Sequence, residues 1–503
     1  MIPMSLAQIA EVTGGRLHGL DDHAAASLVV DGPVVTDSRE AGPGGLYVAR
    51  VGEQLDGHQF VASAAALGAV AAMTTRPVDD LPCVVVDDIQ EGLASLARAV
   101  VDRHPDLTVI GITGSSGKTS TKDLLASVLS SAAPTVAPVG SLNSEVGVPL
   151  TVFRVEPQTR FLVVEMGARG VGHIAYLTRI APPRIGIELN VGSAHVGEFG
   201  SREAIAVAKA ELVEALPATG LAVLNADDAA VRAMAAKTVA RVLLVGSAAD
   251  ADVRATQTTL DESGRPTFRV TTPSGSADVT LPLHGEHHVG NALAVVATAL
   301  ECGLALPDIV AALATATPAS RWRMEVTERP DGVTVVNDAY NANPDSMRAA
   351  LKALVAMGGG RGGADTAPSR RTWAVLGSML ELGDDSTAEH DAIGRLAVRL
   401  NISRLVVVGD TARPMASGAQ HEGSWGDEAV WVPDADAAYA LLAEELRPGD
   451  VVLFKSSRDA GLRWLGDRLA GSGAAEGPDT SSADDSTDNA PDNGADNSEE
   501  GTT

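Results

Sequence analysis

The stretch LTVIGITGSSGKTSTKDLLASVLSSA, residues 107–132, places an apolar run, a glycine- and serine-rich loop and a helical run in succession. This order predicts a strand, a loop whose amide hydrogens surround an anion, and a helix whose N-terminus adds positive potential. In such a loop Lys118 reaches the β- and γ-phosphates of a nucleotide, and the Thr119 hydroxyl binds Mg²⁺. The spacing departs from the strict pattern G-x-x-x-x-G-K-S/T, because Ile112 occupies the position of its first glycine. The context still favours a nucleotide-binding loop over a loop that merely caps a helix.

The alternation of apolar and helical runs continues through most of the chain. Helical runs lie at residues 120–132, 201–216 and 291–303. Apolar runs bounded by turn signals lie at residues 44–50, 81–88, 107–113, 160–167, 184–192, 220–228, 240–246, 332–338, 371–378, 404–410 and 449–457. This alternation predicts an α/β protein whose parallel sheets are covered by helices on both faces. A more polar stretch at about 250–285 predicts antiparallel strands.

The length of 503 residues suggests three domains, since a domain has roughly 150 residues. We place a small α/β domain at residues 1–106, a central nucleotide-binding domain at 107–318 and a third α/β domain at 319–470. Residues 471–503 contain no Lys, Arg, Leu, Ile, Val or aromatic residue, so we expect a disordered and solubilising tail. The Gly-rich interval 357–371 is expected to be a flexible surface loop.

Charge and cysteine content exclude several classes of protein. The formal net charge is −27, and it is still −18 without the nine acidic residues of the tail, which argues against a protein that must neutralise nucleic-acid phosphates. Cys83 and Cys302 provide neither a disulfide framework nor a metal quartet. The N-terminus lacks the pattern of a signal peptide, and the longest Ala-rich run is too short to span a membrane. We therefore expect a cytoplasmic protein without membrane insertion.

Three further residues lie at positions where ligands of a metal ion are expected. Glu165 ends the apolar run 160–167, at the carboxyl edge of a sheet where ligands bind in α/β proteins. His195 follows the next apolar run in a Gly-rich turn, and Lys209 lies on the next helical run. Each has an ordinary interpretation, because His195 alone would be a loop hydrogen-bonding group and Lys209 alone a solvated helix lysine.

The run 332–338 ends in a polar turn, NDAYNANPDSM, that leads into a helix. Asp338 can accept hydrogen bonds from ribose hydroxyls, because a carboxylate takes two donors. The turn is also expected to cap the helix. Upstream, Arg321 and Arg323 either contact phosphate or pair with surface acids.

These motifs together resemble the ATP-dependent Mur ligases of peptidoglycan synthesis, from residue 5 to about 468. The resemblance is carried by TDSREAGPGGLYVARVGEQLDGHQF, GITGSSGKTSTK, SLNSEVGVPLT, VVEMGARGVGHIAYL, NVGSAHVGEFGS, AVAKAEL, HGEHHVGNALA, NDAYNANPDSM, LGSMLELGDDSTAEH and GDVVLFKSSR. The family loop normally has T-G-S/T-x-G-K-T, so Ile112 is ordinary here. The resemblance implies a three-domain α/β architecture with a central P-loop domain and a C-terminal Rossmann-like domain.

The resemblance also implies an activity. Family members that match these motifs best use ATP to add D-alanyl-D-alanine to UDP-N-acetylmuramoyl-tripeptide through an acyl phosphate. The implied cofactors are ATP, two Mg²⁺ ions and a CO₂-derived carbamate on Lys209, and a monomer is expected. Because the domains are expected to close around ATP, Arg323 and Asp338 are expected to lie far from Lys118 in a ligand-free structure.

Site residues are implied position by position. The implied catalytic residues are Lys118, His195, Lys209 and Arg323. The implied ATP contacts are Gly114, Ser115, Ser116, Gly117, Lys118, Thr119, Ser120, Asn291, Arg323, Asp338, Tyr340, Asn341 and Asn343. The implied metal ligands are Thr119, Glu165, His195 and carbamylated Lys209. The implied substrate contacts are Thr36, Asp37, Ser38, Arg39 and Asn143, with Lys455 as an amine-substrate contact.

The sequence departs from the family pattern in three places. Ser144 follows Asn143 where a second asparagine that contacts the substrate is usual. His288 stands in the usual H-N-V as a tolerated change, and Ser456 stands where glycine is more usual. Two other activities remain open. The sister ligase that adds the third, diamino acid residue has different nucleotide-side motifs, and a P-loop ATPase switch would not explain the NDAYNANPDSM segment.

Overall fold

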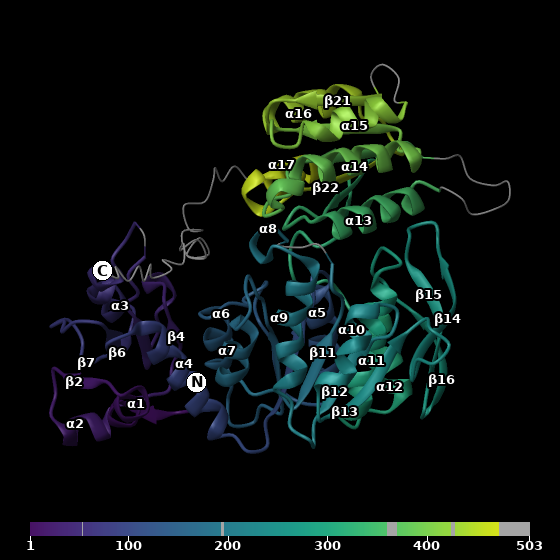
Figure 1. The fold of residues 1–503 in the computed structure, drawn as a ribbon. Coiled ribbons are helices and arrows are strands. Elements are labelled where there is room, and N and C mark those ends of the chain that lie inside the picture. Colours follow the sequence, from purple (N-terminus) through teal and green to yellow (C-terminus); the bar gives the residue numbers. More distant parts are fainter. Residues whose placement is uncertain (53, 193–195, 360–369, 424–427, 472–503) are drawn as a thin grey trace, which may run out of the picture. The chain divides into compact units, whose positions relative to one another are not determined.

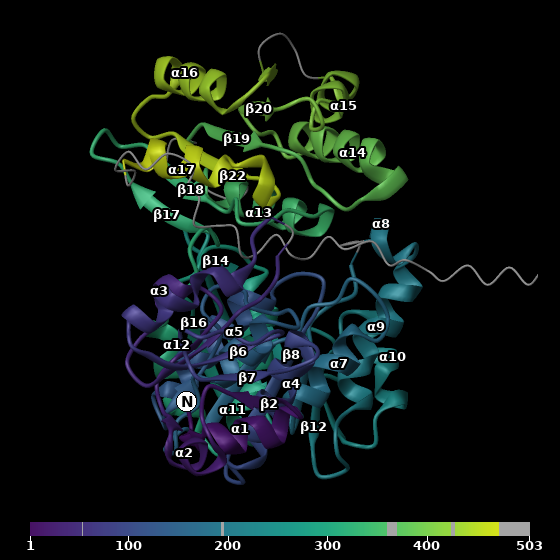
Figure 2. The ribbon, with the colours of Figure 1, turned by 90° about the vertical axis from the view of Figure 1, so that its left-hand side faces the viewer.

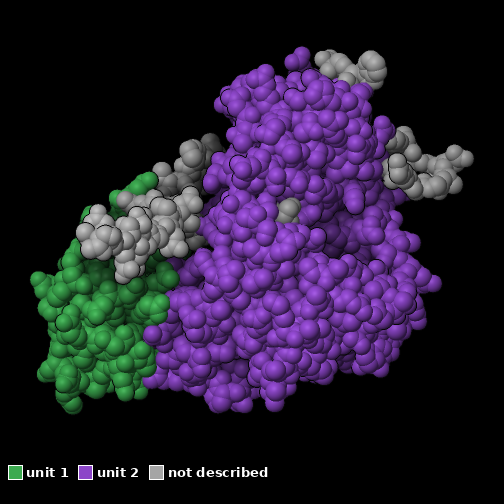
Figure 3. Space-filling view, viewed as in Figure 1, with its two compact units in different colours: residues 1, 3–92, 474–503 green, residues 2, 93–473 purple. Residues whose placement is uncertain are grey.

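The computed structural model describes residues 1–52, 54–192, 196–359, 370–423 and 428–471. The chain forms two compact units, which Figure 3 colours separately. Unit 1 contains Met1 and residues 3–92, and unit 2 contains Ile2 and the described residues from Leu93 onward. Most of the predicted tail and of the Gly-rich interval lies outside the described residues.

Unit 1 is built on a five-stranded sheet. Its strands, in spatial order, are β2 (Arg16–His18), β7 (Cys83–Val85), β6 (Ala69–Thr74), β5 (Gly45–Val48) and β4 (Val34–Val35), and only β2 is antiparallel to its neighbour. A second, two-stranded sheet pairs β1 (Met4–Ser5) with β3 (Val29–Val30). The helices are α1 (Leu6–Thr13), α2 (Asp22–Ser27) and α3 (Val61–Ala66), and α4 (Ile89–Asp102) spans the boundary between the units.

Local sequence explains where α1 begins and ends. Ser5 and Gln8 form a reciprocal capping box at its N-terminus, which satisfies two amide hydrogens that the helix leaves open. Gly14 ends the helix with φ 64°, a left-handed conformation that glycine adopts without steric cost.

Unit 2 contains a nine-stranded sheet and a six-stranded sheet (Figure 1). The larger sheet has the spatial order β16 (Gly275–Thr280), β15 (Pro266–Thr272), β14 (Val253–Leu260), β13 (Arg241–Gly246), β12 (Leu221–Asn225), β11 (Ile185–Glu188), β8 (Thr108–Thr113), β10 (Phe161–Glu165) and β9 (Thr135–Val136). All neighbouring strands from β9 to β13 pair parallel, and β13 pairs parallel with β14. The pairs β14–β15 and β15–β16 are antiparallel. The antiparallel pairing predicted for residues 250–285 is therefore confirmed.

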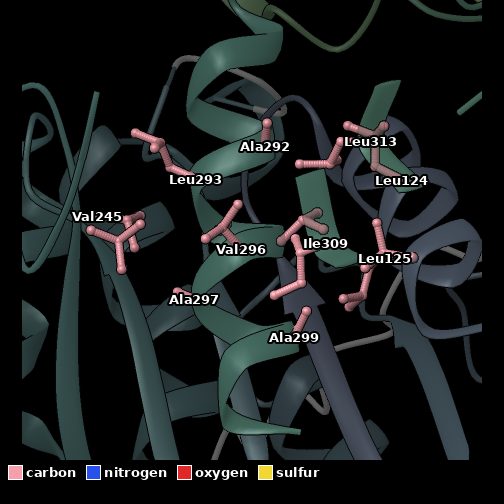
Figure 4. Close-up of a cluster of buried hydrophobic side chains, with 14 of the residues drawn as sticks. Leu124, Leu125, Val245, Ala292, Leu293, Val296, Ala297, Ala299, Ile309 and Leu313 are labelled. Atoms are coloured by element: carbon pink, nitrogen blue, oxygen red, sulfur yellow. The ribbon is translucent and has the colours of Figure 1, made fainter. Parts of the chain in front are cut away.

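Helices cover both faces of the nine-stranded sheet. The helices of this part are α5 (Lys118–Ser130), α6 (Gly147–Val152), α7 (His173–Ile180), α9 (Arg202–Glu214), α10 (Ala229–Ala233), α11 (His288–Glu301) and α12 (Leu306–Thr315), together with the short α8 (Val196–Phe199), which lies against α9 and has no buried residue. One apolar core joins α5, α11 and α12 to one face, and a second core lies under α9 and α10 on the other. Figure 4 shows α11 between Val245 of β13 and the side chains of α5 and α12. The parallel sheet covered on both faces is as predicted.

The six-stranded sheet forms the C-terminal part of unit 2. Its spatial order is β17 (Glu325–Glu328), β18 (Thr334–Asn337), β22 (Val451–Lys455), β19 (Thr372–Leu376), β20 (Arg404–Val408) and β21 (Ala429–Val432), and only β17 is antiparallel. Its helices are α13 (Pro344–Met357), α14 (Ser386–Arg399), α15 (Pro414–Glu422), α16 (Ala435–Glu445) and α17 (Leu462–Ala470). One apolar core packs α13, α14 and α15 against one face of this sheet, and a second core packs α16 and α17 against the other face (Figure 2).

The connections of this sheet define where a ligand binds. The chain passes from β18 through α13 to β19, and β22, the last strand in the sequence, lies between these two strands. Ligands bind in open α/β sheets outside the carboxyl ends of the strands, at the point where the strand order reverses. Asp338 and Lys455 lie at the ends of β18 and β22, at this point.

Candidate active site

The loop between β8 and α5 has the geometry of an anion-binding turn. Gly117 precedes the helix with φ 82°, and no side chain caps the helix N-terminus. The first amide hydrogens of α5 therefore lack a side-chain partner, which suits them to phosphate oxygens. Lys118 donates a hydrogen bond from Nζ to the Gly114 carbonyl at 2.7 Å, and burial lowers the pKa of this lysine.

Asn190, which follows β11, braces the loop from the neighbouring strand. Its carbonyl accepts a hydrogen bond from the Ser115 amide at 3.0 Å, and its Oδ1 accepts one from the Ser116 amide at 2.9 Å. Its Nδ2 donates to the Ser116 carbonyl at 3.1 Å. These bonds hold the loop in its turn conformation. Asn190 was not singled out by the sequence, although its position just after a strand that borders the loop is a usable signal.

Asn291 of α11 lies against the same loop. A Cβ atom built on Gly117 would lie 2.8 Å from the Asn291 Oδ1, so only glycine fits beside this side chain at that conformation. Asn291 therefore lies next to the phosphate loop, and its contact with the nucleotide stays a prediction.

Glu165 and Thr119 offer oxygen ligands beside the loop. Thr119 Oγ1 donates to Glu165 Oε2 at 3.0 Å, and Asn143 Nδ2 donates to Glu165 Oε1 at 2.8 Å. Glu165 is 1% exposed. A carboxylate and a hydroxyl are the hard ligands that Mg²⁺ prefers, so the residues present fit this ion.

Arg323 reaches the phosphate loop from the C-terminal sheet. Its Nη2 lies 3.2 Å from Thr119 Oγ1, and its guanidinium lies 4.3 Å from the centre of the Tyr340 ring. In this structure Arg323 therefore lies beside Lys118, because the Thr119 hydroxyl next to Lys118 accepts its hydrogen bond, and the separation expected for a ligand-free protein stays a prediction. The Nε of Arg323 is buried without a hydrogen-bond acceptor.

The turn that carries Arg323 is strained. Trp322 has φ 57° and Met324 has φ 52°, a left-handed conformation that costs non-glycine residues of the order of 1–3 kcal/mol. The turn is held by surrounding acids, since Asp338 Oδ1 accepts from the Met324 amide at 3.1 Å and Asp467 Oδ2 accepts from Trp322 Nε1 at 3.0 Å. The two strained residues flank Arg323, which indicates that the direction of the Arg323 side chain matters for function.

Lys455 pairs with Asp338 inside the C-terminal sheet. Lys455 is 2% exposed, and its Nζ donates to Asp338 Oδ2 at 2.6 Å and to the Asn341 carbonyl at 3.1 Å. Burial lowers the pKa of Lys455 against the opposing effect of Asp338. In this structure the Lys455 ammonium pairs within the protein and fixes Asp338, and the expected contact of Lys455 with the amine substrate stays a prediction.

The polar turn after β18 contacts the central sheet. Asn343 caps α13 through the Ser346 amide at 2.9 Å, as predicted for this turn, and donates from Nδ2 to the Ser115 carbonyl at 3.3 Å. Tyr340 and Ser141 share a hydrogen bond between their hydroxyls at 2.5 Å. Asn341 is exposed. This turn therefore borders the phosphate loop.

Lys209 lies on α9, as predicted, but it is not solvated. It is 5% exposed, and burial lowers its pKa to about 7. Within the part of the chain that the structure describes, no acceptor lies within hydrogen-bond distance of its Nζ. A buried, neutral amine can react with CO₂, so the residue fits the implied carbamate. His195 lies outside the described residues.

Glu188 was missed by the sequence analysis. It ends β11 and is 1% exposed, and neither carboxylate oxygen has a hydrogen-bond partner. Burial raises its pKa to about 8, with Lys209 and Lys118 opposing the shift. The only sequence signal was an acid at the end of an apolar run, the same signal that singled out Glu165.

Thr36, Asp37, Ser38 and Arg39 lie in unit 1. Asp37 accepts a hydrogen bond from the Arg39 amide at 2.9 Å and from its Nε at 2.9 Å. These bonds to Arg39 lower the pKa of Asp37. Ser38 is largely buried, whereas the Arg39 side chain is 63% exposed. The arginine is thus held by the preceding acid at an exposed position.

Two of the three positions at which the sequence departs from the family pattern have structural explanations. The Ser144 hydroxyl accepts a hydrogen bond from the Gly147 amide at 3.3 Å, so it supports the start of α6. Ser456 is fully buried, and a Cβ atom built on Gly377 would lie 2.9 Å from the Ser456 Cβ. Gly377 therefore provides the room that Ser456 requires.

A cavity of about 240 Å³ lies beside Arg323. Its polar lining includes His284, His288, Ser320 and Arg321, and the rest is mainly apolar. His288 lies 3.5 Å from the Asn291 amide nitrogen, which connects this cavity to the phosphate loop. In the described ranges, no helix is both long and apolar enough to cross a bilayer.

Three family profiles match the chain. Residues 33–110 match the Mur ligase family catalytic domain, residues 112–299 the Mur ligase middle domain, and residues 322–458 the Mur ligase glutamate ligase domain. Together they cover most of the chain.

Relatives match over nearly the full length. The UDP-N-acetylmuramoyl-tripeptide–D-alanyl-D-alanine ligase of Mycobacterium tuberculosis is 50% identical over 93% of this chain and 98% of its own. The ligase of the same name from Escherichia coli is 34% identical, with 92% and 97% covered. Among solved structures, MurF from Acinetobacter baumannii matches with TM-score 0.82 and 32% identity over 93% and 99% of the chains. MurF ligase from Thermotoga maritima in complex with ADP matches with TM-score 0.74 and 28% identity over 90% and 100%.

Proposed function

The chain belongs to the Mur ligase family, and from this premise we propose that it adds D-alanyl-D-alanine to UDP-N-acetylmuramoyl-tripeptide with hydrolysis of ATP to ADP and phosphate. The relatives of that name match the chain over nearly its whole length. The observation that carries the proposal within this structure is the hydrogen bond from Arg323 to Thr119. It brings a cation of the C-terminal sheet to the loop where a γ-phosphate would be held.

ATP is proposed to bind along the phosphate loop with its triphosphate over Gly114–Ser120. The open amides at the start of α5 and the Lys118 ammonium neutralise the β- and γ-phosphates. Arg323 donates to the transferring phosphoryl group, and Asp338 accepts from the ribose hydroxyls. The cavity lined by His284 and His288 is proposed to receive the adenosine end, beside Asn291. Tyr340, Asn341 and Asn343 border the same nucleotide.

The metal ligands of the proposed site are Thr119 and Glu165, with His195 and carbamylated Lys209 at a second position. Bound Mg²⁺ would reduce the repulsion between an anionic carboxylate and an anionic phosphate. Lys209 acquires its carbamate when the neutral amine attacks CO₂, which forms an N–C bond and releases one proton. The resulting oxygens suit a hard cation, whereas an ammonium does not.

The ligation then proceeds in two steps. An oxygen of the tripeptide carboxylate attacks the γ-phosphorus and ADP leaves, which gives an acyl phosphate. The neutral amine of the dipeptide attacks the acyl carbon, a tetrahedral intermediate forms, phosphate leaves and the nitrogen loses one proton. Lys118 and Arg323 stabilise the charge on the phosphoryl group, and Asn143 is proposed to orient the substrate near its reacting end.

The UDP end of the substrate is proposed to bind in unit 1 at Thr36–Arg39. The Arg39 guanidinium is exposed and positively charged, which suits a diphosphate. We propose a monomer that acts in the cytoplasm, where its nucleotide-linked substrate is available.

Phosphate release tests this function. We expect rapid release only when ATP, UDP-N-acetylmuramoyl-tripeptide and D-alanyl-D-alanine are all present, together with a product whose mass equals the sum of both substrates less one water. Product mass with several UDP-linked peptides and amines separates this activity from the addition of a diamino acid. Comparable phosphate release with ATP alone would instead indicate an ATPase switch, and would contradict the proposal.

A further inference from the structure

Glu188 is a buried carboxylate without a partner. It is 1% exposed, and both of its oxygens lack hydrogen bonds. A buried polar group without a hydrogen-bond partner costs about 1–3 kcal/mol, so a protein retains one where another group satisfies it during function. The reaction steps described above leave Glu188 without a role.

The sheet register places Glu188 beside the phosphate loop. Glu188 of β11 pairs with Thr113 of β8, so both side chains point to the same face of the sheet. The Thr113 Oγ1 is also buried without a hydrogen-bond partner. A carboxylate and a hydroxyl, both unsatisfied, therefore lie side by side at the strand ends that precede Gly114 and Leu189.

Helix α9 covers this face and brings Lys209 to the same edge. Cβ atoms built on Gly111 and Gly186 would lie 2.8 and 3.3 Å from Leu212 side-chain atoms. Lys209 precedes Leu212 by three residues, or about 4.5 Å along the helix. Thr113 and Glu188 lie two residues beyond the glycines, or about 6.6 Å along the strands. Helix α9 runs antiparallel to the strands. A step back along the helix from Leu212 to Lys209 therefore points in the same direction as a step forward along the strands from the glycines to Thr113 and Glu188, and Lys209 lies at the level of Glu188.

The charged groups that act on Glu188 leave both of its oxygens without a hydrogen-bond partner in the described part of the chain. Lys209, Lys118 and Asp228 are the charged residues that act on it. No ion pair within 4.0 Å joins Glu188 to either lysine in the described part of the chain. Lys118 is already directed to the Gly114 carbonyl, and Asp228 accepts the Val191 amide and caps α10.

We infer that Glu188 is an additional carboxylate ligand of a divalent cation, which it binds opposite the Lys209 carbamate with the Thr113 hydroxyl beside it. This inference rests on the proposed function, because a cation can enter only when Lys209 has exchanged its ammonium for a carbamate. Hard oxygen ligands of this kind suit Mg²⁺. Glu188 would thus hold the ion on the α9 face of the sheet, whereas Glu165 pairs with Ile112 of β8 and lies on the α5 face.

Mn²⁺ binding to the full chain tests the inference. Titration is followed by electron paramagnetic resonance with a non-hydrolysable ATP analogue and excess bicarbonate. We expect two Mn²⁺ ions per wild-type chain and at least tenfold weaker binding of one of them in Glu188→Gln. Glu214→Gln changes a half-exposed acid on α9, the helix that carries Lys209, and should bind both ions as the wild type does. Unchanged affinity for both ions in Glu188→Gln would overturn the inference.

Unfolding without metal or bicarbonate provides a second readout. Glu188→Gln replaces a buried carboxyl group without hydrogen-bond partners by an amide of the same shape, so its unfolding midpoint should be close to that of the wild type. A lowered midpoint together with unchanged Mn²⁺ binding would identify Glu188 as a counter-ion of the Lys209 ammonium, which also overturns the inference. Failure of the proposed function is distinguishable, because the wild type would then show no phosphate release that depends on the dipeptide.

Discussion

Lys118 and Lys209 illustrate how burial changes the chemistry of a single residue. Burial lowers the pKa of both amines, but their surroundings differ. Lys118 has a carbonyl acceptor in the phosphate loop and Glu165 nearby, which favour its charged form. Lys209 has no comparable hydrogen-bond acceptor among the residues described. The first is therefore suited to bind phosphate as a cation, and the second to react as a neutral amine.

Replacement of Lys118 by alanine should abolish ligation. We expect kcat to fall by about a hundredfold to a thousandfold, because the loss of a preorganised charge contact to a reacting group costs about 3–4 kcal/mol. Initial rates of phosphate release with both substrates measure the effect, and circular dichroism confirms folding. Near-normal turnover in Lys118→Ala would contradict the assignment of the phosphate loop.

Replacement of Lys209 by alanine should impair activity in a way that small carboxylates relieve. The variant retains space for an anion where the carbamate would lie, so added acetate or formate should restore part of the rate. The same acids should not restore Lys118→Ala, which serves as the control. Wild-type activity in Lys209→Ala without added carboxylate would show that the lysine is not carbamylated for catalysis.

His390 makes the stability of the C-terminal sheet sensitive to acid. It is fully buried, its Nε2 accepts from the Met379 amide at 3.0 Å, and its Nδ1 lies 2.6 Å from the Ser386 carbonyl. This arrangement requires the neutral ring, and burial lowers its pKa. An unfolded histidine binds its proton near pH 6.5, so stability should fall as the pH drops below about 6.5.

The measurement is the free energy of unfolding by urea between pH 5 and 8. The loss by pH 5 attributable to His390 should be about 1–2 kcal/mol, the cost of one buried hydrogen bond. His390→Gln should be less stable than the wild type at pH 8 but lose less stability on acidification. Parallel pH dependences of the two proteins would exclude His390 as the source.

At the scale of elements, α5 is connected to the segment that carries Arg323. Lys122 is 2% exposed and forms an ion pair with Asp123. It also donates to the Pro138 carbonyl at 3.0 Å and to Ser320 Oγ at 3.2 Å. Asp123 Oδ2 accepts from the Ser320 amide at 3.0 Å. The phosphate-loop helix therefore fixes the start of the turn that aims Arg323.

Asp123→Asn should destabilise the protein and slow catalysis. It leaves the buried Lys122 ammonium without its counter-ion, which costs about 3–5 kcal/mol, whereas the amide oxygen can still accept from Ser320. The double variant Lys122→Met with Asp123→Asn removes that unpaired charge and should recover most of the stability. Urea unfolding and kcat measure the effects. A double variant no more stable than the single one would contradict this interpretation.

The sequence predicted most elements because their signals are local. The apolar runs at 107–113 and 160–167 became β8 and β10, and the helical run at 201–216 became α9. The cap at Asn343 was also local, since a cap depends on residues three apart. The positions of Glu188 and Asn190 were available as strand ends, but their contacts depend on which strands are neighbours.

Other features required tertiary information. The burial of Lys455 follows from the pairing of β18, β22 and β19, because its partner Asp338 is 117 residues away in sequence. The left-handed turn at Trp322 and Met324 contradicts local preference, and it is maintained by Asp338 and Asp467 from distant elements. Sequence patterns do not encode such compensation, so the direction of Arg323 could not be predicted.

At the scale of unit 2, the two sheets share one nucleotide site and should respond to ligand together. Arg323 and Asn343 of the C-terminal part donate hydrogen bonds to Thr119 and Ser115 of the central part. An ATP analogue at one hundred times its Kd should stabilise the folded chain by about 2.7 kcal/mol. If both parts hold the nucleotide, a change in either one should reduce this stabilisation.

Arg323→Ala should therefore bind the analogue about tenfold more weakly, which at the same concentration removes about 1.4 kcal/mol of the stabilisation. The ligand-induced shift of the unfolding midpoint measures this loss. Arg269→Ala provides a control, since Arg269 lies on β15 and pairs with Asp278 at 3.0 Å rather than with the loop. An equal shift in Arg323→Ala and the wild type would mean that the central sheet binds nucleotide alone, and that the contact to Thr119 is replaced when ligand enters.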